Sequence, residues 1–127
     1  MKEAVEKASG NVLTYGLGLG YYAYMVSEKP NVESVTIVDS NEDVIDLFQT
    51  YILPQFTNAK KIKIIKEDAF EYARERMPKG NYDFVFTDLW HDVSDGIDMY
   101  VEMKKYEKTC PTTEFSYWIE KSILCYM

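Results

Sequence analysis

The sequence predicts an α/β protein with three layers, in which helices cover both faces of a mainly parallel β-sheet of about four strands. Two observations lead to this class: short apolar runs of strand length alternate with segments of helical periodicity, and a glycine-rich turn follows the first strand. The 127 residues, 46% of them hydrophobic, suffice for one hydrophobic core but not for two. We therefore treat residues 1–127 as a single domain.

Four short segments have the composition of strands, because they are rich in β-branched or aromatic residues and are bounded by polar residues, glycine or proline. They span 11–15, 34–39, 61–66 and 82–87. Helical segments separate them, so the crossovers are expected to be right-handed and the strands parallel.

Helical periodicity is clearest between the second and third strands. Apolar residues recur at i, i+3, i+4 and i+7 over 44–52, Ser40 and Asp43 resemble a capping box, and Pro54 ends the segment. We expect a helix here.

Three further helices are predicted after the third strand. A short one spans 69–77 and is followed by a turn. Two more span 97–108 and 114–126 and are separated by Pro111.

The charge of the chain limits its partners. Fourteen basic and 21 acidic residues give a net charge of −7, which repels phosphate backbones and anionic lipid head groups, so we expect no nucleic acid and no membrane partner. No apolar run is long enough to cross a bilayer and the N-terminus lacks a secretion signal, which predicts a cytoplasmic protein. Cys110 and Cys125 form no CxxC pair, so we expect neither a zinc site nor a disulfide framework, but two buried or half-buried thiols.

The most informative segment is the turn after the first strand, where Gly16, Gly18 and Gly20 form a G-x-G-x-G sequence. Glycines at this place let a ligand approach the backbone at the start of a helix. A dinucleotide-binding G-x-G-x-x-G motif would need a small residue where Tyr21 stands, and no Gly-Lys-Ser/Thr of a P-loop is present. A purely structural turn is the alternative.

Two carboxylates follow at the ends of the second and third strands. Asp39 lies where an acidic residue accepts hydrogen bonds from ribose hydroxyls in such folds, and Asp68 lies where a carboxylate could accept a hydrogen bond from an adenine amino group. Either residue could instead cap the helix that follows it. Their order after the glycine turn favours a nucleoside site.

Taken in order, these segments resemble the class I S-adenosylmethionine (SAM)-dependent methyltransferases, which have a Rossmann-like fold, and within them the branch that contains spermidine synthases. The resemblance covers about residues 10 to 100 and is carried by GLGLG at 16–20, VTIVD at 35–39, IIKEDAF at 64–70 and YDFVFTD at 82–88. Methyltransferases generally have an acidic residue two places before the first glycine. Here that place is Thr14, and the spermidine synthase-like branch is usually not acidic there.

The resemblance implies a cofactor-binding set for SAM. The three glycines would face its methionine part, Asp39 would bind the ribose, and Asp68 with Ala69 would bind the adenine. Ser40, next to Asp39, belongs to the same predicted set.

The resemblance also implies a catalytic residue. Asp88 matches the start of the spermidine synthase loop D-S-x-D-P, whose aspartates hold and deprotonate the attacking amine. Here the loop reads DLWHD, so His91 takes the place of the second aspartate and the proline is absent. A sulfonium carbon is already activated, so placement of the nucleophile and removal of its proton supply most of the catalysis.

Trp90 and His91 are candidate residues for binding a small-molecule acceptor. An indole face can stabilise a cation, and histidine titrates near neutral pH. Packing is the alternative role for Trp90, and a solvated loop position is the alternative for His91. We expect no metal site, because acidic residues before a helix usually cap it.

Three functions stay open at this point. They are methyl transfer from SAM to a small-molecule or protein acceptor, aminopropyl transfer from decarboxylated SAM, and SAM binding or a structural role without catalysis. The related sheets have more strands than the four predicted here, so the resemblance implies that the C-terminal strands are missing. An open sheet edge and an apolar C-terminal segment predict a homo-oligomer.

Overall fold

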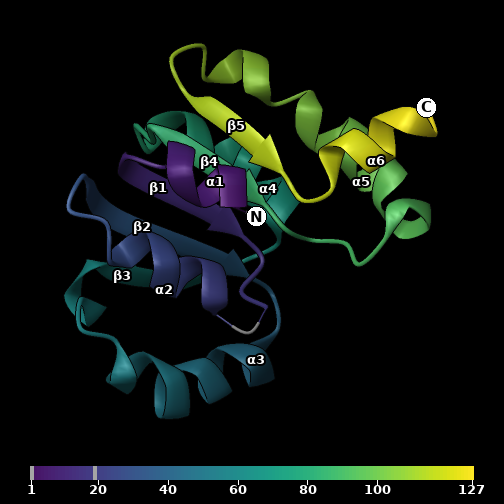
Figure 1. Ribbon diagram of the computed structural model, residues 1–127. Helices are drawn as coiled ribbons and strands as arrows, with labels where there is room; N and C mark the ends of the chain where they lie inside the picture. Colours follow the sequence, from purple (N-terminus) through teal and green to yellow (C-terminus); the bar gives the residue numbers. More distant parts are fainter. Residues whose placement is uncertain (1, 19) are drawn as a thin grey trace.

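A computed structural model describes residues 2–18 and 20–127. Within these ranges five strands form one parallel sheet in the order β3-β2-β1-β4-β5 (Figure 1). The strands are β1 (Gly10–Tyr15), β2 (Val32–Asp39), β3 (Ile62–Lys66), β4 (Phe84–Thr87) and β5 (Glu114–Tyr117). The predicted α/β class and parallel sheet are confirmed.

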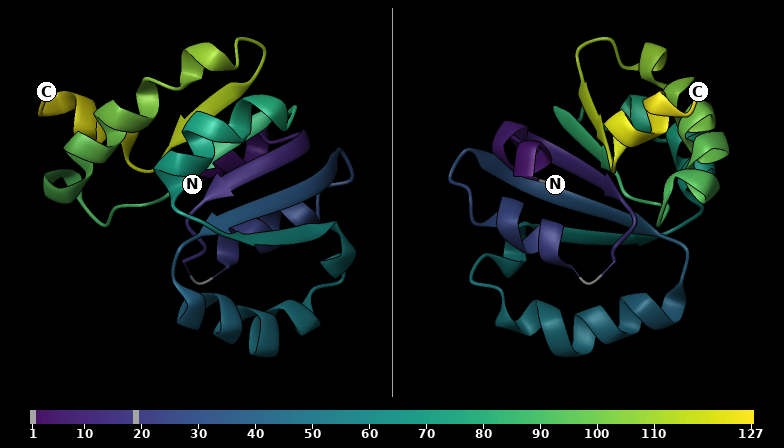
Figure 2. Two further views of the ribbon diagram at one scale, coloured as in Figure 1. Left: turned by 180° about the vertical axis from the view of Figure 1, so that it is seen from behind. Right: turned by 45° about the vertical axis from the view of Figure 1, so that its right-hand side comes forward.

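The α-helices form a layer on each side of the sheet (Figure 2). One layer holds α1 (Lys2–Lys7), α2 (Tyr21–Ser27) and α3 (Glu42–Leu47), and the other holds α4 (Ala69–Glu75), α5 (Val93–Lys104) and α6 (Glu120–Cys125). Short 3₁₀ turns lie at Leu53–Gln55, Ala59–Lys61, Met77–Lys79 and Glu107–Thr109. None of the helices in the described ranges is long and apolar enough to cross a membrane.

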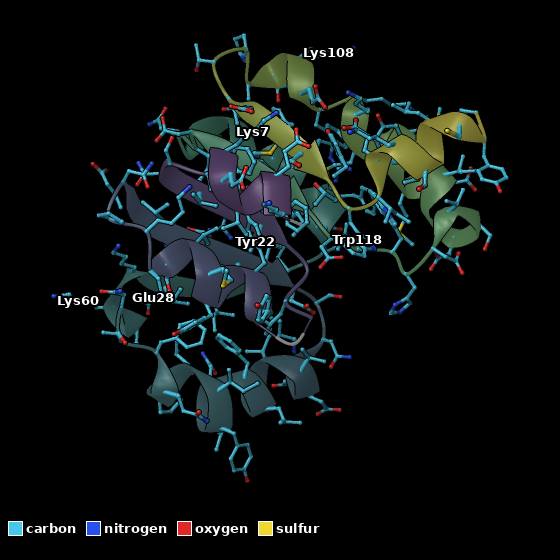
Figure 3. All side chains as sticks on the ribbon, in the orientation of Figure 1. Lys7, Tyr22, Glu28, Lys60, Lys108 and Trp118 are labelled. Atoms are coloured by element: carbon cyan, nitrogen blue, oxygen red, sulfur yellow. The ribbon has the colours of Figure 1, made fainter. Side chains whose placement is uncertain are left out.

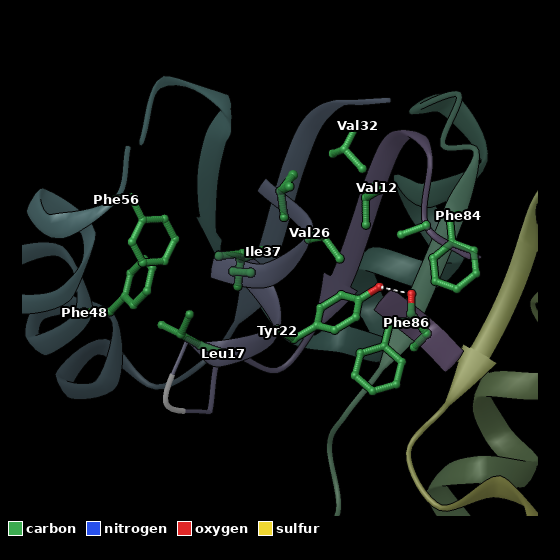
Figure 4. Packing of buried hydrophobic residues seen from close by; sticks show 14 of the residues in the cluster. Val12, Leu17, Tyr22, Val26, Val32, Ile37, Phe48, Phe56, Phe84 and Phe86 are labelled. Atoms are coloured by element: carbon green, nitrogen blue, oxygen red, sulfur yellow. Dashed lines mark hydrogen bonds between the residues drawn. The ribbon is translucent and has the colours of Figure 1, made fainter. Parts of the chain in front are cut away.

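The central strands form the core of the molecule. All four residues of β4 are buried, and so are the last four of β1, because helices cover both faces of a parallel sheet. Figure 4 shows the cluster on the α2 side, where Val12, Ile37 and Phe86 of three neighbouring strands meet Tyr22 and Val26 of α2. Charged side chains such as Lys7, Glu28, Lys60 and Lys108 project from the outer surface (Figure 3).

The C-terminal segment differs from the prediction. The helix expected over 114–126 is a strand, β5, followed by the short helix α6. Glu114 to Tyr117 pair with β4, so the sheet gains a fifth strand. Ile119 then adopts a left-handed conformation with φ 48°, which interrupts both strand and helix geometry. Aromatic residues at 115, 117 and 118 fit a strand as well as a helix, and the pairing with β4 decides between them.

Two helix starts also differ from the prediction. Asn41, and not Ser40 with Asp43, is the N-cap of α3: its side chain accepts from the backbone N–H groups of Asp43 and Val44. α3 then continues into a π-helical turn (Phe48–Ile52), so the predicted 44–52 segment is helical but irregular. α5 begins at Val93 rather than at 97, because Asp92 and Asp95 form a capping box.

The order of the strands creates a place for a ligand. After β1 the chain runs outward through β2 to β3 and then returns to β4 on the other side of β1. The loops that follow β1 and β4 therefore diverge at the carboxyl end of the sheet, which is where open α/β sheets form their binding crevice.

Candidate functional site

Two adjoining cavities lie where the loops after β1 and β4 diverge, a place that we call the switch point. One, here called the α2 cavity, has a volume of about 210 Å³ and is lined by Thr14, Leu17, Tyr21, Tyr22 and Ala23. The other, the Asp39 cavity, has a volume of about 490 Å³ and is lined by Asp39, Asn41, Val44, Leu89, Trp90 and His91. Both are also lined by Gly16, Gly18 and Asp88, so the structure brings the glycine turn together with the candidate catalytic residue.

The glycine turn passes very close to the β4 loop. A Cβ added to Gly16 would lie 2.1 Å from the backbone oxygen of Asp88, so only glycine fits at this position. Gly18 has a φ of 54° and open space around its backbone, which leaves it accessible from both cavities. Gly20 lines neither cavity and lies against the ring of Phe48.

Asp39 links the end of β2 to the glycine turn. Its Oδ2 accepts a hydrogen bond from the backbone N–H of Leu17 at 2.9 Å, and its Oδ1 accepts one from the N–H of Asn41 at 2.8 Å. Each carboxylate oxygen has a second lone pair, so the half-buried group can still accept two donors from the cavity side. Asp39 therefore lines the cavity with free acceptor sites, and its contact with ribose hydroxyls stays a prediction.

The other predicted cofactor-binding residues do not line either cavity. Asp68 caps α4, since its Oδ2 accepts from the backbone N–H groups of Phe70 and Glu71 at 3.0 Å each, and Ala69 is buried against the sheet. Ser40 is exposed, while its neighbour Asn41 lines the Asp39 cavity instead. The adenine contacts assigned to Asp68 and Ala69 stay predictions.

Asp88 borders both cavities from the end of β4. Its backbone N–H donates to the carbonyl of Tyr15 at 2.9 Å, which fixes the start of the loop. Its carboxylate has no hydrogen-bond donor among the described residues. Burial raises the pKa of the Asp88 carboxyl above its usual range, and the nearby His91 charge opposes this rise. A carboxylate of raised pKa at the meeting point of two cavities is suited to accepting a proton.

Trp90 has the packing role that the sequence left as the alternative. Its side chain is only 2% exposed, its ring stacks on that of Tyr117, and its Nε1 donates to the carbonyl of Trp118 at 2.9 Å. The indole therefore joins the β4 loop to the end of β5 and does not offer a free face to a cation. His91 is exposed at the edge of the Asp39 cavity.

Thr14 is a site residue that the sequence did not single out as functional. It lines the α2 cavity, is 2% exposed, and its Oγ1 has no hydrogen-bond partner among the described residues. The only sequence signal was its place two residues before Gly16.

The charges around both cavities are almost entirely negative. Asp39 and Asp88 contribute carboxylates, and none of the described residues that line them is a lysine or an arginine. His91 is the one lining side chain in the described ranges that can become a cation. Such a site attracts cationic groups and repels anionic ones.

The sequence pattern of the spermine/spermidine synthase domain matches residues 3–109. The chain belongs to the spermine/spermidine synthase domain family. The match contains both the glycine turn and the Asp88 loop, in agreement with the spermidine synthase-like resemblance of the motifs.

Two solved structures have the same fold as this family member. Spermidine synthase from Thermotoga maritima aligns with a TM-score of 0.61 and 18% identity, over 89% of this chain and 39% of the synthase. A conserved hypothetical protein from Streptococcus pyogenes aligns with a TM-score of 0.59 and 16% identity, over 79% of this chain and 61% of that protein. The chain thus spans less than two thirds of either structure. No curated protein matches it in sequence.

Proposed function

We propose that this chain binds decarboxylated SAM at the switch point and takes part in aminopropyl transfer from it. The observation that carries the proposal is the charge of the two cavities, which are bordered by the carboxylates of Asp39 and Asp88 with no lysine or arginine among the described lining residues. The family supports the same choice of donor.

The charge argument distinguishes decarboxylated SAM from SAM. Both carry an adenosyl group, a sulfonium cation and a primary ammonium group, but only SAM also carries a carboxylate at the end of its chain. Two carboxylates about 4 Å apart repel by about 4 kcal/mol at an effective dielectric constant of about 20. A SAM carboxylate beside Asp88 would meet this repulsion, and His91 is the one lining side chain in the described ranges that could oppose it. Decarboxylated SAM has no carboxylate, so its ammonium group is attracted to Asp88 without this penalty.

The Asp39 cavity suits the adenosyl part of such a donor. Asp39 offers free acceptor sites to the ribose hydroxyls, and Val44 and Leu89 supply apolar side chains to the same cavity. Flat apolar contacts with a few placed polar groups are what small-ligand sites usually provide. The sulfonium end would then lie where the two cavities meet, beside Asp88.

The proposed reaction needs one proton acceptor from the chain. An amine nitrogen attacks the methylene carbon that joins the aminopropyl chain to the sulfonium sulfur. The bond between this carbon and the sulfur breaks, and its electron pair stays on sulfur, which leaves neutral 5′-methylthioadenosine. The attacking nitrogen loses one proton, which the Asp88 carboxylate accepts. His91 is exposed and lines the Asp39 cavity, which supports a contact between its side chain and the incoming amine.

Product analysis tests the proposal. The purified chain is incubated with putrescine and either decarboxylated SAM or SAM, and the nucleoside products are separated by chromatography. We expect 5′-methylthioadenosine from decarboxylated SAM, and none above background with Asp88→Asn. Formation of S-adenosylhomocysteine from SAM would instead establish methyl transfer and overturn the proposal. Binding of decarboxylated SAM without any product would reduce the proposed function to binding alone.

A further inference from the structure

Buried hydroxyl groups almost always have a hydrogen-bond partner, because leaving one unpaired costs free energy. In the described part of the chain, two buried side-chain oxygens lack one: Oγ1 of Thr14 and Oγ1 of Thr87. Both lie at the carboxyl ends of neighbouring strands, but only Thr14 lines a cavity at the switch point. The unpaired hydroxyl of Thr14 is therefore a candidate contact for a ligand in the α2 cavity.

The neighbours of Thr14 explain why its hydroxyl is unpaired. In the sheet it stands between Ile37 of β2 and Phe86 of β4, and both are apolar. Tyr22 lines the same cavity, and its ring packs on Phe86 with centroids 4.4 Å apart (Figure 4). The Tyr22 hydroxyl is already bound to the carbonyl of Ala4 at 3.0 Å. None of these side chains forms a hydrogen bond with the Thr14 hydroxyl, which is left to the α2 cavity.

We propose that the Thr14 hydroxyl is the hydrogen-bond acceptor for the primary ammonium group at the end of the donor's aminopropyl chain, which makes Thr14 a specificity-determining residue. This inference rests on the proposed function and adds to it the residue that recognises the end of the chain. Among the described residues that line the α2 cavity, Thr14 alone has a buried side-chain polar atom without a hydrogen-bond partner.

The chemistry of the α2 cavity favours an ammonium over the other groups that a hydroxyl can bind. A carboxylate could accept from Thr14, but it would lie in the same small cavity as the Asp88 carboxylate. A neutral methyl or thioether end would leave the hydroxyl unpaired. An ammonium donates to Thr14 and is attracted by Asp88.

The test uses Thr14→Val, which keeps the shape of the side chain and removes the hydroxyl. Calorimetry compares decarboxylated SAM with 5′-methylthioadenosine, which has the same nucleoside but no aminopropyl chain. We expect Thr14→Val to weaken decarboxylated SAM roughly 10-fold or more, as for a lost hydrogen bond to a charged group, and to leave 5′-methylthioadenosine within about 2-fold of the unsubstituted protein. The melting temperature should stay the same or rise, because an unpaired buried hydroxyl is removed.

Two variants serve as controls. Thr14→Ser keeps the hydroxyl and should still bind decarboxylated SAM in preference to 5′-methylthioadenosine. Thr87→Val removes the other unpaired hydroxyl, which lines neither cavity, and should leave the affinities for both ligands unchanged. This pair separates loss of the Thr14 hydroxyl from a general disturbance of the strand ends.

The possible outcomes are distinguishable. If the unsubstituted protein prefers decarboxylated SAM and Thr14→Val keeps that preference, the role of Thr14 is wrong while the proposed function stands. Equal weakening of both ligands would show a damaged cavity rather than a lost hydrogen bond, and would also overturn it. If the unsubstituted protein binds neither ligand, the proposed function fails and the role of Thr14 fails with it.

Discussion

Asp39 has two roles in the structure, and one substitution tests both. It holds the backbone N–H groups of Leu17 and Asn41 and offers free acceptors to the Asp39 cavity. Asp39→Ala should weaken binding of 5′-methylthioadenosine by about 1 to 3 kcal/mol, roughly 5- to 150-fold, because the ribose hydroxyls lose their acceptors. It should also lower the melting temperature, because two backbone donors lose theirs. Calorimetry and thermal unfolding measure the two effects.

Ser40→Ala is the matched control for Asp39→Ala. Ser40 is exposed, lines neither cavity and does not cap α3, so its substitution should change neither the affinity nor the melting temperature. A drop in the affinity for 5′-methylthioadenosine with Ser40→Ala would instead support the cofactor-binding role that the sequence predicted for Ser40. If Asp39→Ala changed only the melting temperature, the ribose assignment would be wrong.

The raised pKa of Asp88 gives a prediction for pH. The base must be ionised to act, so the acid limb of the kcat/KM profile should lie above the ordinary pKa of an aspartate. The His91 charge lowers the pKa of Asp88, and His91→Ala should therefore move this limb to higher pH. The acid limb is measured from the rate of 5′-methylthioadenosine formation at a series of pH values. An acid limb that does not move in His91→Ala would contradict the electrostatic link between the two residues.

Asp88 also affects stability, with the opposite pH dependence. Burial raises its folded-state pKa, so the folded protein is favoured below the ordinary pKa of aspartate, and this contribution is lost as pH rises through the raised pKa. At neutral pH, Asp88→Asn should thus melt no lower than the unsubstituted chain while its turnover falls roughly 100-fold or more. A large drop in melting temperature would mean that Asp88 is mainly structural.

The sequence could identify these residues only where a motif marks them. Asp39 and Asp88 end strands after apolar runs, and a spacing argument finds both. The roles of Thr14 and Trp90 depend on contacts between distant parts of the chain: Thr14 is unpaired because of Ile37 and Phe86, and Trp90 is buried because β5 lies beside β4. Such contacts are visible only in the folded structure.

At the scale of the elements, the glycine turn allows the end of β1 and the loop after β4 to approach each other closely. Gly16→Ala would place a Cβ 2.1 Å from the Asp88 backbone oxygen and must push the two strand ends apart, whereas Gly18→Ala meets nothing within 4 Å and costs only the strain of its positive φ. We expect Gly16→Ala to lower the free energy of unfolding by several kcal/mol and Gly18→Ala by about 1 kcal/mol. Urea unfolding of the two variants compares them. Similar losses would contradict the close approach.

The elements themselves were predicted well where local pattern and tertiary pairing agree. The four strands that the sequence indicated are present. β1, β2 and β4 lie inside the sheet and are largely buried, as central parallel strands are, whereas β3 is an edge strand whose β-branched residues pair with β2. β5 was mistaken for a helix because Phe115, Tyr117 and Trp118 suit either structure, and only the edge of β4 selects the strand. The start of α5 was missed because a capping box, Asp92 with Asp95, extends the helix beyond its apolar pattern.

At the scale of the whole molecule, the prediction of self-association rests on a smaller surface than the sequence indicated. Tyr117 and Ile123 are buried within the chain, while Leu124 is 53% exposed and β5 has no strand paired on its outer side within the described ranges. An open strand edge favours association with a second chain. We expect light scattering to show a mass that rises with concentration. A concentration-independent monomer would remove this prediction.

The charge of the cavities is the central claim, and one titration tests it most directly. Calorimetry at low and at physiological salt compares decarboxylated SAM with SAM, with NAD as the ligand that the glycine spacing excludes. A site bordered by Asp39 and Asp88 without lysine or arginine should bind decarboxylated SAM at least about 10-fold more tightly than SAM, and should not bind NAD. If SAM bound as tightly as decarboxylated SAM, or if NAD bound more tightly than either, the claim about the charge of the cavities would be contradicted.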